Sequence, residues 1–564
     1  MRYQRRHTVL STGLASIVLG AVALVPTSSS APAATGPRNV VVRARAGHLI
    51  EAERLIVSMG GDVTRVLPII DGVAATIDAS HLSDLTGSSS IVAVTTDGEV
   101  SPMSVDPTLG YDPSSMTSMS SISQITGAQS MWNLGWTGQG VDIALIDTGI
   151  ARVPGLDRAG KVIDGPDLSF DSQEPTLTNI DAFGHGTHMA GIIAGSDVAP
   201  GTSGANCKTC LGRSAYTDVT KFEGIAPDAR LINVKVGAYD GAADVSQVIA
   251  GIDWVVQHAH DKGFNIRVIN LSFGTDTTQD PLLDPLVFAA EQAWNAGIVV
   301  VAASGNDGRG EGPLAAPAVS PSVIAVGASD PHGSLDVSDD KTPSFSQRGD
   351  DRRRVDVVAP GVSVISLRVP GGFVDQNVTT GKVGTRFQQA SGTSQSTAVV
   401  SGLAALLISK YPTARPDEIK NYLTANALGI KKAKNVVGSL LDPKYAGYGE
   451  ASVAGNGSTS FVYIALPVPT RGTGLGSLEA SRGTYHVSNG VADLTGEQDI
   501  FGQPWNAPAM ATLTAARSTW KGGVWNGARW SGDNWSGTRW SGALWTSNDW
   551  TGARWSGARW SSMI

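Results

Sequence analysis

Short, strongly apolar runs alternate with segments of helical periodicity across the central part of the chain. Such runs, bounded by Gly, Asp or Asn, are typical of strands that are buried on both faces of a sheet. They occur at 141–149, 230–236, 266–274, 297–306 and 322–328. The segments between them with apolar residues at helical spacing are 246–262, 285–297 and 394–411. This alternation predicts an α/β domain over 124–456, with a mostly parallel sheet and helices on both faces.

The residues before this domain carry strand and helix signals in the order βαββαβ, over 38–100. The strand-like runs are 38–45, 62–70, 72–79 and 91–100, and the helical ones are 46–61 and 80–89. This order predicts a small ferredoxin-like α+β unit. A stretch rich in Ser, Met, Pro and Asp follows at 101–123. We expect an exposed linker there, where proteolysis is easiest.

The charged and apolar residues at 1–34 are arranged as in an export signal. Arg2, Arg5 and Arg6 precede an apolar run at 9–25, and a small-residue stretch ends at Ala34. The run is short for a membrane anchor and no positive stop follows it. The signal therefore predicts a secreted protein, either extracellular or associated with the cell wall. The paired arginines are also compatible with twin-arginine export.

The C-terminal part has two compositions. Residues 457–519 are rich in Gly, Ser, Thr and Val, which predicts a β-rich connecting region. The tail at 520–564 repeats a tryptophan every five residues, at Trp520, Trp525, Trp530, Trp535, Trp540, Trp545, Trp550, Trp555 and Trp560. Short glycine-punctuated repeats usually stack as an array, which would be a β-rich repeat tail. The rings either form the core of that array or stand exposed beside arginines, suited to cell-envelope polymers.

The charge of the chain argues against some classes of partner, and its two cysteines restrict the kinds of cysteine site that it can form. Charged residues are 16% of the 564 residues and the formal net charge is −8, which argues against a nucleic-acid partner. Cys207 and Cys210 form a C-x-x-C pair, which fits a redox site or half of a zinc site. The second half of a zinc site is missing, and outside the cell we favour a small local disulfide.

An aspartate and a histidine occur where acyl-transfer chemistry would need them. Asp147 ends the buried run at 141–149, where a carboxylate can orient an imidazole and stabilise its cation. His185 begins a Gly- and Ala-rich helical segment in the string "GHGTH". His188 stands three residues further on, so one of the two would be the base and the other structural. A turn aspartate and two helix-start histidines are the simpler alternative for these strings taken alone.

A serine and an asparagine could supply the other two groups that acyl-transfer chemistry would need. Ser394 follows Gly392 and Thr393 at the start of a helical segment, where the helix dipole favours developing negative charge. Asn306 ends the buried run at 297–306, where its amide could donate to an oxyanion. A helix cap and a turn asparagine would explain these positions but not the strings around them.

In the order Asp, His, Asn, Ser, these four strings resemble the subtilisin-like serine peptidases over about 125–455. The resemblance implies a secreted serine endopeptidase that works through an acyl-enzyme. Ser394 would attack, His185 rather than His188 would move the proton, and Asp147 would orient His185. Asn306 and the Ser394 backbone amide would hold the oxyanion.

The same resemblance implies further sites and partners. Protein or peptide substrates would pair with Ser272, Phe273 and Gly274 as an added strand. The wall of the primary specificity pocket would be Ala303, Ser304 and Gly305. The segment 38–100 would be an inhibitory propeptide. No cofactor is implied for the chemistry; the family often binds structural calcium, but no ligands are assigned here.

The sequence also departs from the family pattern. Gln395, Ser396 and Ala398 follow the serine where the family usually has Met, Ala and Pro. Long insertions at 198–223 and 370–389 would reshape access to the site. The alternative function is that of a catalytically weak surface-binding protein dominated by the Trp tail.

Overall fold

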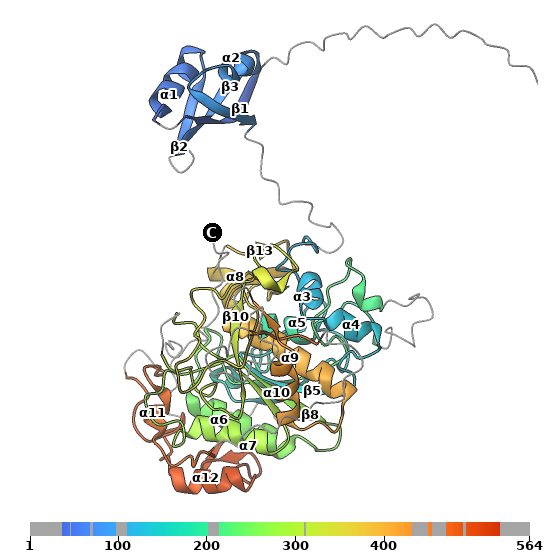
Figure 1. Ribbon diagram of the computed structural model, residues 1–564. Helices are drawn as coiled ribbons and strands as arrows, with labels where there is room; N and C mark the ends of the chain where they lie inside the picture. The colour runs from blue at the N-terminus through green and yellow to red at the C-terminus, as the bar shows by residue number, and fades with distance from the viewer. Residues whose placement is uncertain are drawn as a thin grey trace, which may run out of the picture. The chain divides into compact units, whose positions relative to one another are not determined.

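The computed structural model describes most of the chain as two separate units, Met1–Met103 and Ser104–Ile564 (Figure 1). The described residues are 36–45, 47–67, 71–96, 110–200, 214–308, 312–378, 380–430, 449–453, 470–488 and 492–530. Cys207, Cys210, the export signal at 1–34 and the tail beyond 530 lie outside them. Among the described residues, no helix is long and apolar enough to cross a membrane.

The N-terminal unit has the βαββαβ order that its sequence predicts. Its elements are β1 (Pro37–Ala44), α1 (Leu49–Ser58), β2 (Asp62–Leu67), β3 (Gly72–Asp78), the 3-10 turn Ala79–His81, α2 (Leu82–Thr86) and β4 (Ile91–Thr96). The strands pair antiparallel in the order β2-β3-β1-β4. Val42, Ile56, Val73 and Leu85 are fully buried between the sheet and the helices. The unit therefore has a hydrophobic core of its own.

The larger unit is built on a nine-stranded sheet in the order β15-β16-β11-β10-β9-β8-β5-β7-β6. Its strands are β5 (Asp142–Asp147), β6 (Val162–Asp167), β7 (Arg230–Lys235), β8 (Ile266–Leu271), β9 (Val299–Ala303), β10 (Ile324–Ser329), β11 (Val357–Pro360), β15 (Leu428–Gly429) and β16 (Gly449–Glu450). All neighbouring strands run parallel except β15 and β16. Each of the five apolar runs became one strand, so the predicted fold class is confirmed.

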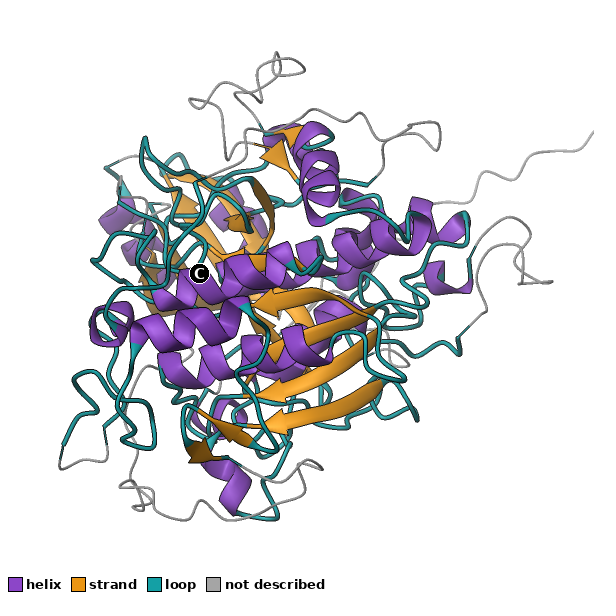
Figure 2. Cartoon of the chain, turned by 90° about the horizontal axis from the view of Figure 1, so that it is seen from below, coloured by secondary structure: helices purple, strands orange, loops and turns teal. Residues whose placement is uncertain are grey.

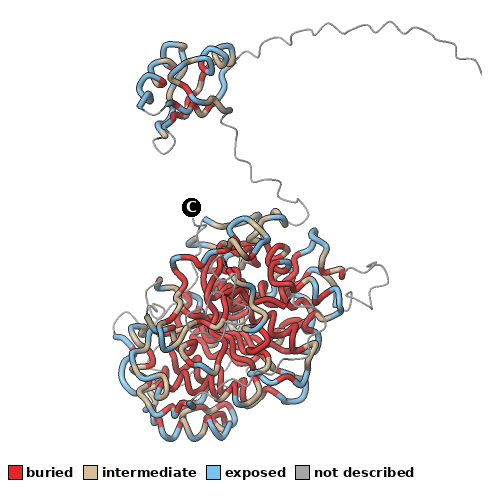
Figure 3. The backbone as a smooth tube through the Cα atoms, viewed as in Figure 1, coloured by how far each residue is buried: buried red, intermediate tan, exposed pale blue. Residues whose placement is uncertain are grey.

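Helices cover both faces of this sheet (Figure 2). The described helices of this unit up to residue 425 are α3 (Met119–Ile125), α4 (Ala128–Asn133), α5 (His185–Ala194), α6 (Val245–His258), α7 (Pro285–Asn295), α8 (Phe373–Asn377), α9 (Thr393–Lys410) and α10 (Pro416–Ala425). Asn270 in β8 accepts a hydrogen bond from Ser401 of α9, which places α9 on one face. Leu145 of β5 is in register with Asn270, so the next residue, Ile146, points to the other face, where it meets Gly251 of α6. The core between these layers is almost fully buried (Figure 3).

A small three-stranded sheet, β12-β14-β13, lies beside α5. Its strands are β12 (Val364–Leu367), β13 (Lys382–Val383) and β14 (Phe387–Ala390). The strand β13 and all but the last residue of β14 come from the predicted insertion at 370–389. The Ser366 hydroxyl of β12 donates to the His188 carbonyl oxygen, so this sheet packs directly on the helix that begins at His185.

The predicted linker at 101–123 is wrong in its second half. Tyr111 and Met119 are buried, and Ser118 caps α3 by accepting a hydrogen bond from the Ser121 backbone N–H. Ser, Pro and Asp favour helix caps and turns as well as exposed linkers, so composition alone did not separate the two. The part that remains available as a linker is 101–109, outside the described residues.

The predicted β-rich region at 457–519 is also not what the structure shows. Its described residues contain the helices α11 (Leu478–Arg482) and α12 (Ala507–Ala515), with isolated bridges but no strand. Asn506 caps α12 and Pro508 stands in its first turn. The segment packs against α6 and α7, and this tertiary packing outweighs the weak β preference of Thr and Val.

Arg482 joins this C-terminal segment to the sheet domain through a buried ion pair. Its Nε donates to Asp244, the N-cap of α6, at 2.7 Å, and both side chains are fully buried. The guanidinium also donates to the carbonyl oxygens of Gly496 and Gln498. Burial alone would raise the pKa of Asp244, but the adjacent Arg482 charge brings it below its usual value.

The first three repeat tryptophans, Trp520, Trp525 and Trp530, are buried, and the indole N–H groups of Trp520 and Trp525 donate to residues of α6. Trp525 ends β17 (Val524–Trp525), which pairs with β18 (Ala528–Arg529) in a short hairpin. The rings of Trp525 and Trp530 meet edge to face with centroids 5.6 Å apart. For these three repeats the rings are core; the remaining six lie outside the described residues.

We expect stability to depend on pH through Asp253 of α6, which accepts a hydrogen bond from the Trp525 indole at 2.9 Å. Burial raises the pKa of Asp253 to about 7. The folded state thus holds a proton that the unfolded chain releases near pH 4, so the free energy of unfolding falls as pH rises from about 4 to about 7.

Asp253→Asn keeps an acceptor for Trp525 and removes this titration. The variant should therefore match the parent near pH 4.5 and exceed it at pH 8, with an upper bound of about 4 kcal/mol. Urea unfolding of both proteins at the two pH values, in a Ser394→Ala background to prevent autolysis, measures the difference. Equal pH dependence of the two proteins would count against a proton on Asp253.

Candidate active site

Asp147 and His185, which are far apart in sequence, meet at the end of the central strand. β5 ends at Asp147, and His185 is the first residue of α5. His185 Nδ1 lies 2.8 Å from Oδ1 and 3.0 Å from Oδ2 of Asp147, with both side chains fully buried. Burial raises the pKa of Asp147, while His185 and the Thr148 backbone N–H offset part of that rise. The carboxylate is thus placed to fix the orientation of the imidazole ring.

Asp181, which the sequence reasoning missed, holds the start of α5 against this strand end. Its carboxylate accepts hydrogen bonds from the backbone N–H groups of Gly184 and Thr187, both at 2.7 Å. It also accepts one from the Thr148 hydroxyl, which follows Asp147. An aspartate four residues before a helical histidine was the available signal, since such a residue can reach the free N–H groups of the first turn.

Gly186 permits the close approach of α5 to the loop after β5. A Cβ at this position would lie 2.1 Å from the Gly149 carbonyl oxygen and 3.2 Å from Asp147 Oδ1. A larger residue would therefore push His185 away from Asp147. The glycine in the string "HGTH" is required by this backbone contact.

His188, the rival base, has a different environment. Its Nε2–H donates to the Gln388 carbonyl oxygen at 3.1 Å, on the side of the small sheet. Burial lowers the pKa of His188 to about 3, so it is neutral at physiological pH. The geometry therefore brings His185, and not His188, to the aspartate.

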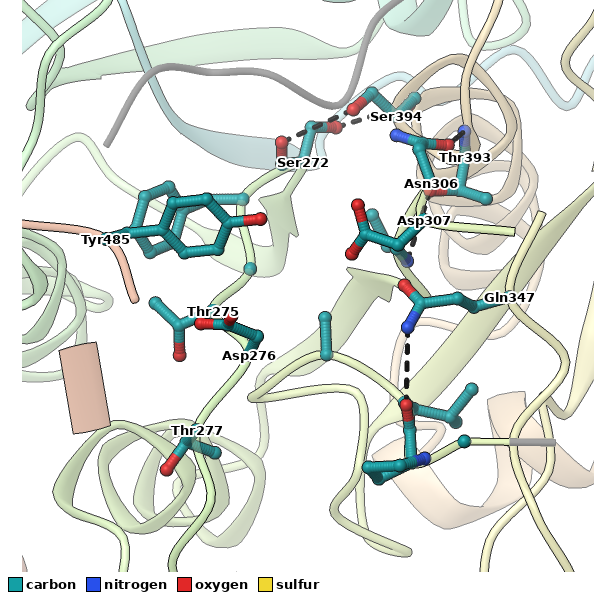
Figure 4. A pocket seen from close by; sticks show the side chains of 18 residues that line it. Ser272, Thr275, Asp276, Thr277, Asn306, Asp307, Gln347, Thr393, Ser394 and Tyr485 are labelled. Carbon is teal, nitrogen blue, oxygen red and sulfur yellow. Dashed lines mark hydrogen bonds between the residues drawn. The ribbon is translucent and has the colours of Figure 1, made fainter. Parts of the chain in front are cut away.

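Ser394 is the second residue of α9, and two strand ends surround it. Its hydroxyl donates to the Ser272 carbonyl oxygen at 3.3 Å, and the Ser272 hydroxyl donates to the Ser394 carbonyl oxygen at 3.2 Å. Asn306 accepts a hydrogen bond from the Thr393 backbone N–H through Oδ1, at 2.9 Å (Figure 4). That bond fixes the orientation of the Asn306 amide. Its oxygen faces the start of α9, so its Nδ2 points in the other direction.

Beside Ser394 and Asn306 lies a cavity of about 240 Å³ (Figure 4). It is lined by Ser272, Phe273, Gly274, Thr275, Asp276, Thr277, Ala303, Gly305, Asn306, Asp307, Gly312, Pro313, Leu314, Ala315, Gln347, Thr393, Ser394 and Tyr485. Five of the six predicted substrate-binding residues are among them. The sixth, Ser304, is fully buried behind the wall and donates its hydroxyl to the Gln347 carbonyl oxygen.

Comparison with known proteins agrees with this arrangement. The profile of the subtilase family, Peptidase S8, matches residues 138–456, which is more than half of the chain. The chain belongs to the subtilase family. It is accordingly a serine endopeptidase, and its natural substrates would be proteins or peptides.

Several relatives cover the same part of this subtilase. Serine protease AprX of Bacillus subtilis (strain 168) is 37% identical over 293 residues, which are 51% of this chain and 61% of AprX. Subtilisin DY of Bacillus licheniformis is 33% identical over 298 residues, covering 52% of this chain and 86% of its own. A crystal structure of a cold adapted subtilisin-like serine proteinase is 25% identical and covers 56% of this chain and 89% of its own, with a TM-score of 0.38.

Several residues that line the cavity of this subtilase were not singled out from the sequence, among them Asp276, Asp307, Gln347 and Tyr485. Asp307 directly follows Asn306, so its position beside the cavity could have been predicted from that of Asn306. Gln347 reaches the cavity through a loop, with its Nε2 donating to the Pro313 carbonyl oxygen at 3.3 Å. Tyr485 comes from the C-terminal segment, beyond the family match, and no sequence signal pointed to it.

Metal binding stays an expectation. Within the described ranges, no group of three or more His, Cys, Asp or Glu side chains is placed to hold a metal ion. The predicted Cys207–Cys210 disulfide and residues 201–213 of the insertion that carries it fall outside those ranges.

Proposed function

We propose that this enzyme cleaves peptide bonds through an acyl-enzyme on Ser394, with His185 as the general base and Asp147 as its orienting partner. The observation that carries the proposal is the buried contact between His185 Nδ1 and Asp147 at the end of β5. The neighbouring strand β8 leads to Ser272, whose carbonyl oxygen accepts the Ser394 hydroxyl at the start of α9. With Nδ1–H held by the carboxylate, the other ring nitrogen, Nε2, is the one that can accept a proton.

Catalysis on this arrangement requires the Ser394 hydroxyl to turn. It donates to the Ser272 carbonyl oxygen in the structure, and it would exchange that bond for one to His185 Nε2. Ser394 Oγ then adds to the scissile carbonyl carbon while His185 takes the proton. His185 next gives that proton to the leaving amine as the C–N bond breaks. Water then adds to the acyl carbon while His185 takes its proton, and His185 returns that proton to Ser394 Oγ as the ester bond breaks and the carboxylic acid leaves.

Negative charge that develops on the carbonyl oxygen would be met by two donors. One is the Ser394 backbone N–H, within the first turn of α9, where intrahelical partners are absent and the helix dipole is favourable. The other is Asn306 Nδ2, whose orientation is supported by the bond from Thr393 N–H to Oδ1. Donors held in place before reaction stabilise the transition state more than the bound substrate.

Asn306→Asp tests the oxyanion role with little change in shape. The aspartate can still accept from Thr393 N–H but has no amide hydrogens to donate. We expect kcat to fall by about 10²–10³, a magnitude borrowed from subtilisin, with a small change in KM. Steady-state kinetics on a peptide anilide measure both constants. A kcat within twofold of the parent would exclude Asn306 as a donor.

We further propose that the N-terminal unit is an inhibitory propeptide of a secreted zymogen. Its own buried core supports independent folding, and the division between the two units falls after Met103, inside the predicted linker. Residues 36–100 added to the mature enzyme should inhibit it, and linker cleavage should fail in the full-length Ser394→Ala protein. An excess of the unit without effect, or normal cleavage of that variant, would refute the corresponding half of this proposal.

The alternative function is surface binding by the Trp tail, and only the part of the tail beyond Trp530 is still a candidate for it. Trp520, Trp525 and Trp530 are buried and so are unsuited to binding a polymer. Attachment to cell-envelope polymers remains a proposal for 531–564. Deleting these residues and measuring retention on cell-envelope preparations tests it, since unchanged retention would remove the tail from attachment.

A further inference from the structure

The wall of the substrate cavity is completed by a residue from outside the family domain. Tyr485 lines the cavity that also contains Ser394 and Asn306, yet the family match ends at residue 456. In Figure 4 its ring lies across the cavity from Asp307 and Gln347, with its hydroxyl toward the open space. Tyr485 therefore stands where a substrate side chain would enter.

The segment around Tyr485 is fixed on both sides of the residue. Thr484 donates to the Asp276 carboxylate through its backbone N–H and through its hydroxyl. Gly483, at φ 64°, approaches Asp276 so closely that a Cβ would lie 2.1 Å from Oδ1. Arg482 is locked by its buried ion pair, and Val487 is fully buried. The ring is thus held by the fold rather than by a loop tip.

The charged side chains among the described residues that line the cavity are all negative. Asp276 and Asp307 bring two carboxylates, and Gln347 Oε1 is a buried acceptor with no partner in the described part of the chain. Among the described residues that line it, none is Lys, Arg or His. An aromatic face, two carboxylates and a carbonyl oxygen together suit a cationic side chain, through cation–π contact and charge-assisted hydrogen bonds.

We propose that Tyr485 is a specificity-determining residue, and that with Asp276 and Asp307 it selects a lysine or arginine side chain immediately before the scissile bond. The inference rests on the proposed acyl-enzyme mechanism, since that places this cavity beside the acyl group. A planar guanidinium can stack on the ring while Asp307 and Gln347 accept its hydrogens from the facing wall.

The test uses the mature enzyme and peptide substrates that differ only in the residue before the cleaved bond: arginine, norleucine or glutamate. The parent should prefer arginine to norleucine in kcat/KM, and should disfavour glutamate by roughly tenfold or more. Tyr485→Ala should lower the arginine-to-norleucine ratio by about two- to thirtyfold. Tyr485→Phe keeps the ring and should keep the ratio within about twofold.

Two further variants distinguish a change in substrate selection from a loss of folded structure. Asp307→Asn should lower the same ratio by about two- to fivefold, because it removes an exposed charge without changing shape. Leu475→Ala, at an exposed position of the same segment, should leave the ratio unchanged. Unfolding temperatures of all variants show whether a change in ratio comes from loss of the segment.

The outcomes distinguish failure of this inference from failure of the mechanism. If the parent turns over norleucine substrates in a Ser394-dependent way, but prefers them to arginine or keeps its ratio in Tyr485→Ala, the inference is wrong and the mechanism stands. If turnover persists in Ser394→Ala, the mechanism itself is wrong. A ratio that falls in Tyr485→Ala and is kept in Tyr485→Phe supports the proposal.

Discussion

Ser394→Ala is expected to lower kcat by about 10⁶, which corresponds to about 8 kcal/mol of transition-state stabilisation. The magnitude is borrowed from subtilisin, where loss of the nucleophile costs about this much. The physical reason is that neither His185 nor Asn306 can form the acyl-enzyme without an oxygen at this position. The fold should be unchanged, because the buried hydroxyl makes one hydrogen bond, to Ser272.

Comparing the parent with Ser394→Ala requires both proteins in their mature form. A site for an unrelated peptidase placed in 101–109 matures the variant without its own activity. Far-ultraviolet circular dichroism and unfolding temperature then control for structure, and a peptide anilide gives kcat. Retained turnover above about one part in a thousand of the parent would mean that another residue is the nucleophile.

Arg482→Ala is expected to have the largest effect on stability, lowering the free energy of unfolding by about 3–5 kcal/mol. It leaves the fully buried Asp244 carboxylate without its cation at the start of α6. It also strips the carbonyl oxygens of Gly496 and Gln498 of a donor. Denaturant unfolding at pH 7, in the Ser394→Ala background, measures the change.

Arg354→Ala is the matched control for this prediction. Arg354 pairs with Asp351, whose side chain is 97% exposed, so the loss should be below about 1 kcal/mol. Equal losses for the two arginines would show that the buried pair is not what joins the C-terminal segment to α6. A large loss for Arg482 alone would make that segment part of the enzyme's folding unit.

The sequence was sufficient for the parts of this molecule whose signals are local. Five strands of the large sheet have an apolar run, so β5, β7, β8, β9 and β10 were predicted, whereas β6, with the sequence VIDGPD, was not. The four candidate catalytic residues lie at strand ends or helix starts, which periodicity also marks. Parallel strands bring such ends together at one edge, which is why Asp147, Asn306 and the helix starts converge.

Features that depend on tertiary packing were not predictable in the same way. His185 and His188 share one string, and their residue types alone did not separate them. The family resemblance favoured His185, and the contacts to Asp147 and Gln388 show the two different environments. Tyr111 and Met119 lie in a stretch that resembles a linker, yet they pack into the core. Tyr485 reaches the cavity because Arg482 and Thr484 find partners more than 200 residues away in sequence.

The central claim, that Ser394 is the nucleophile activated by His185, is tested most directly by covalent labelling. A fluorophosphonate reacts with an activated serine, and mass spectrometry of the digested protein locates the adduct. We predict one adduct per molecule, on the peptide that contains Ser394, with activity lost in proportion to labelling and no labelling of a His185→Ala variant. An adduct on a different residue, or full activity in protein labelled at Ser394, would contradict the account.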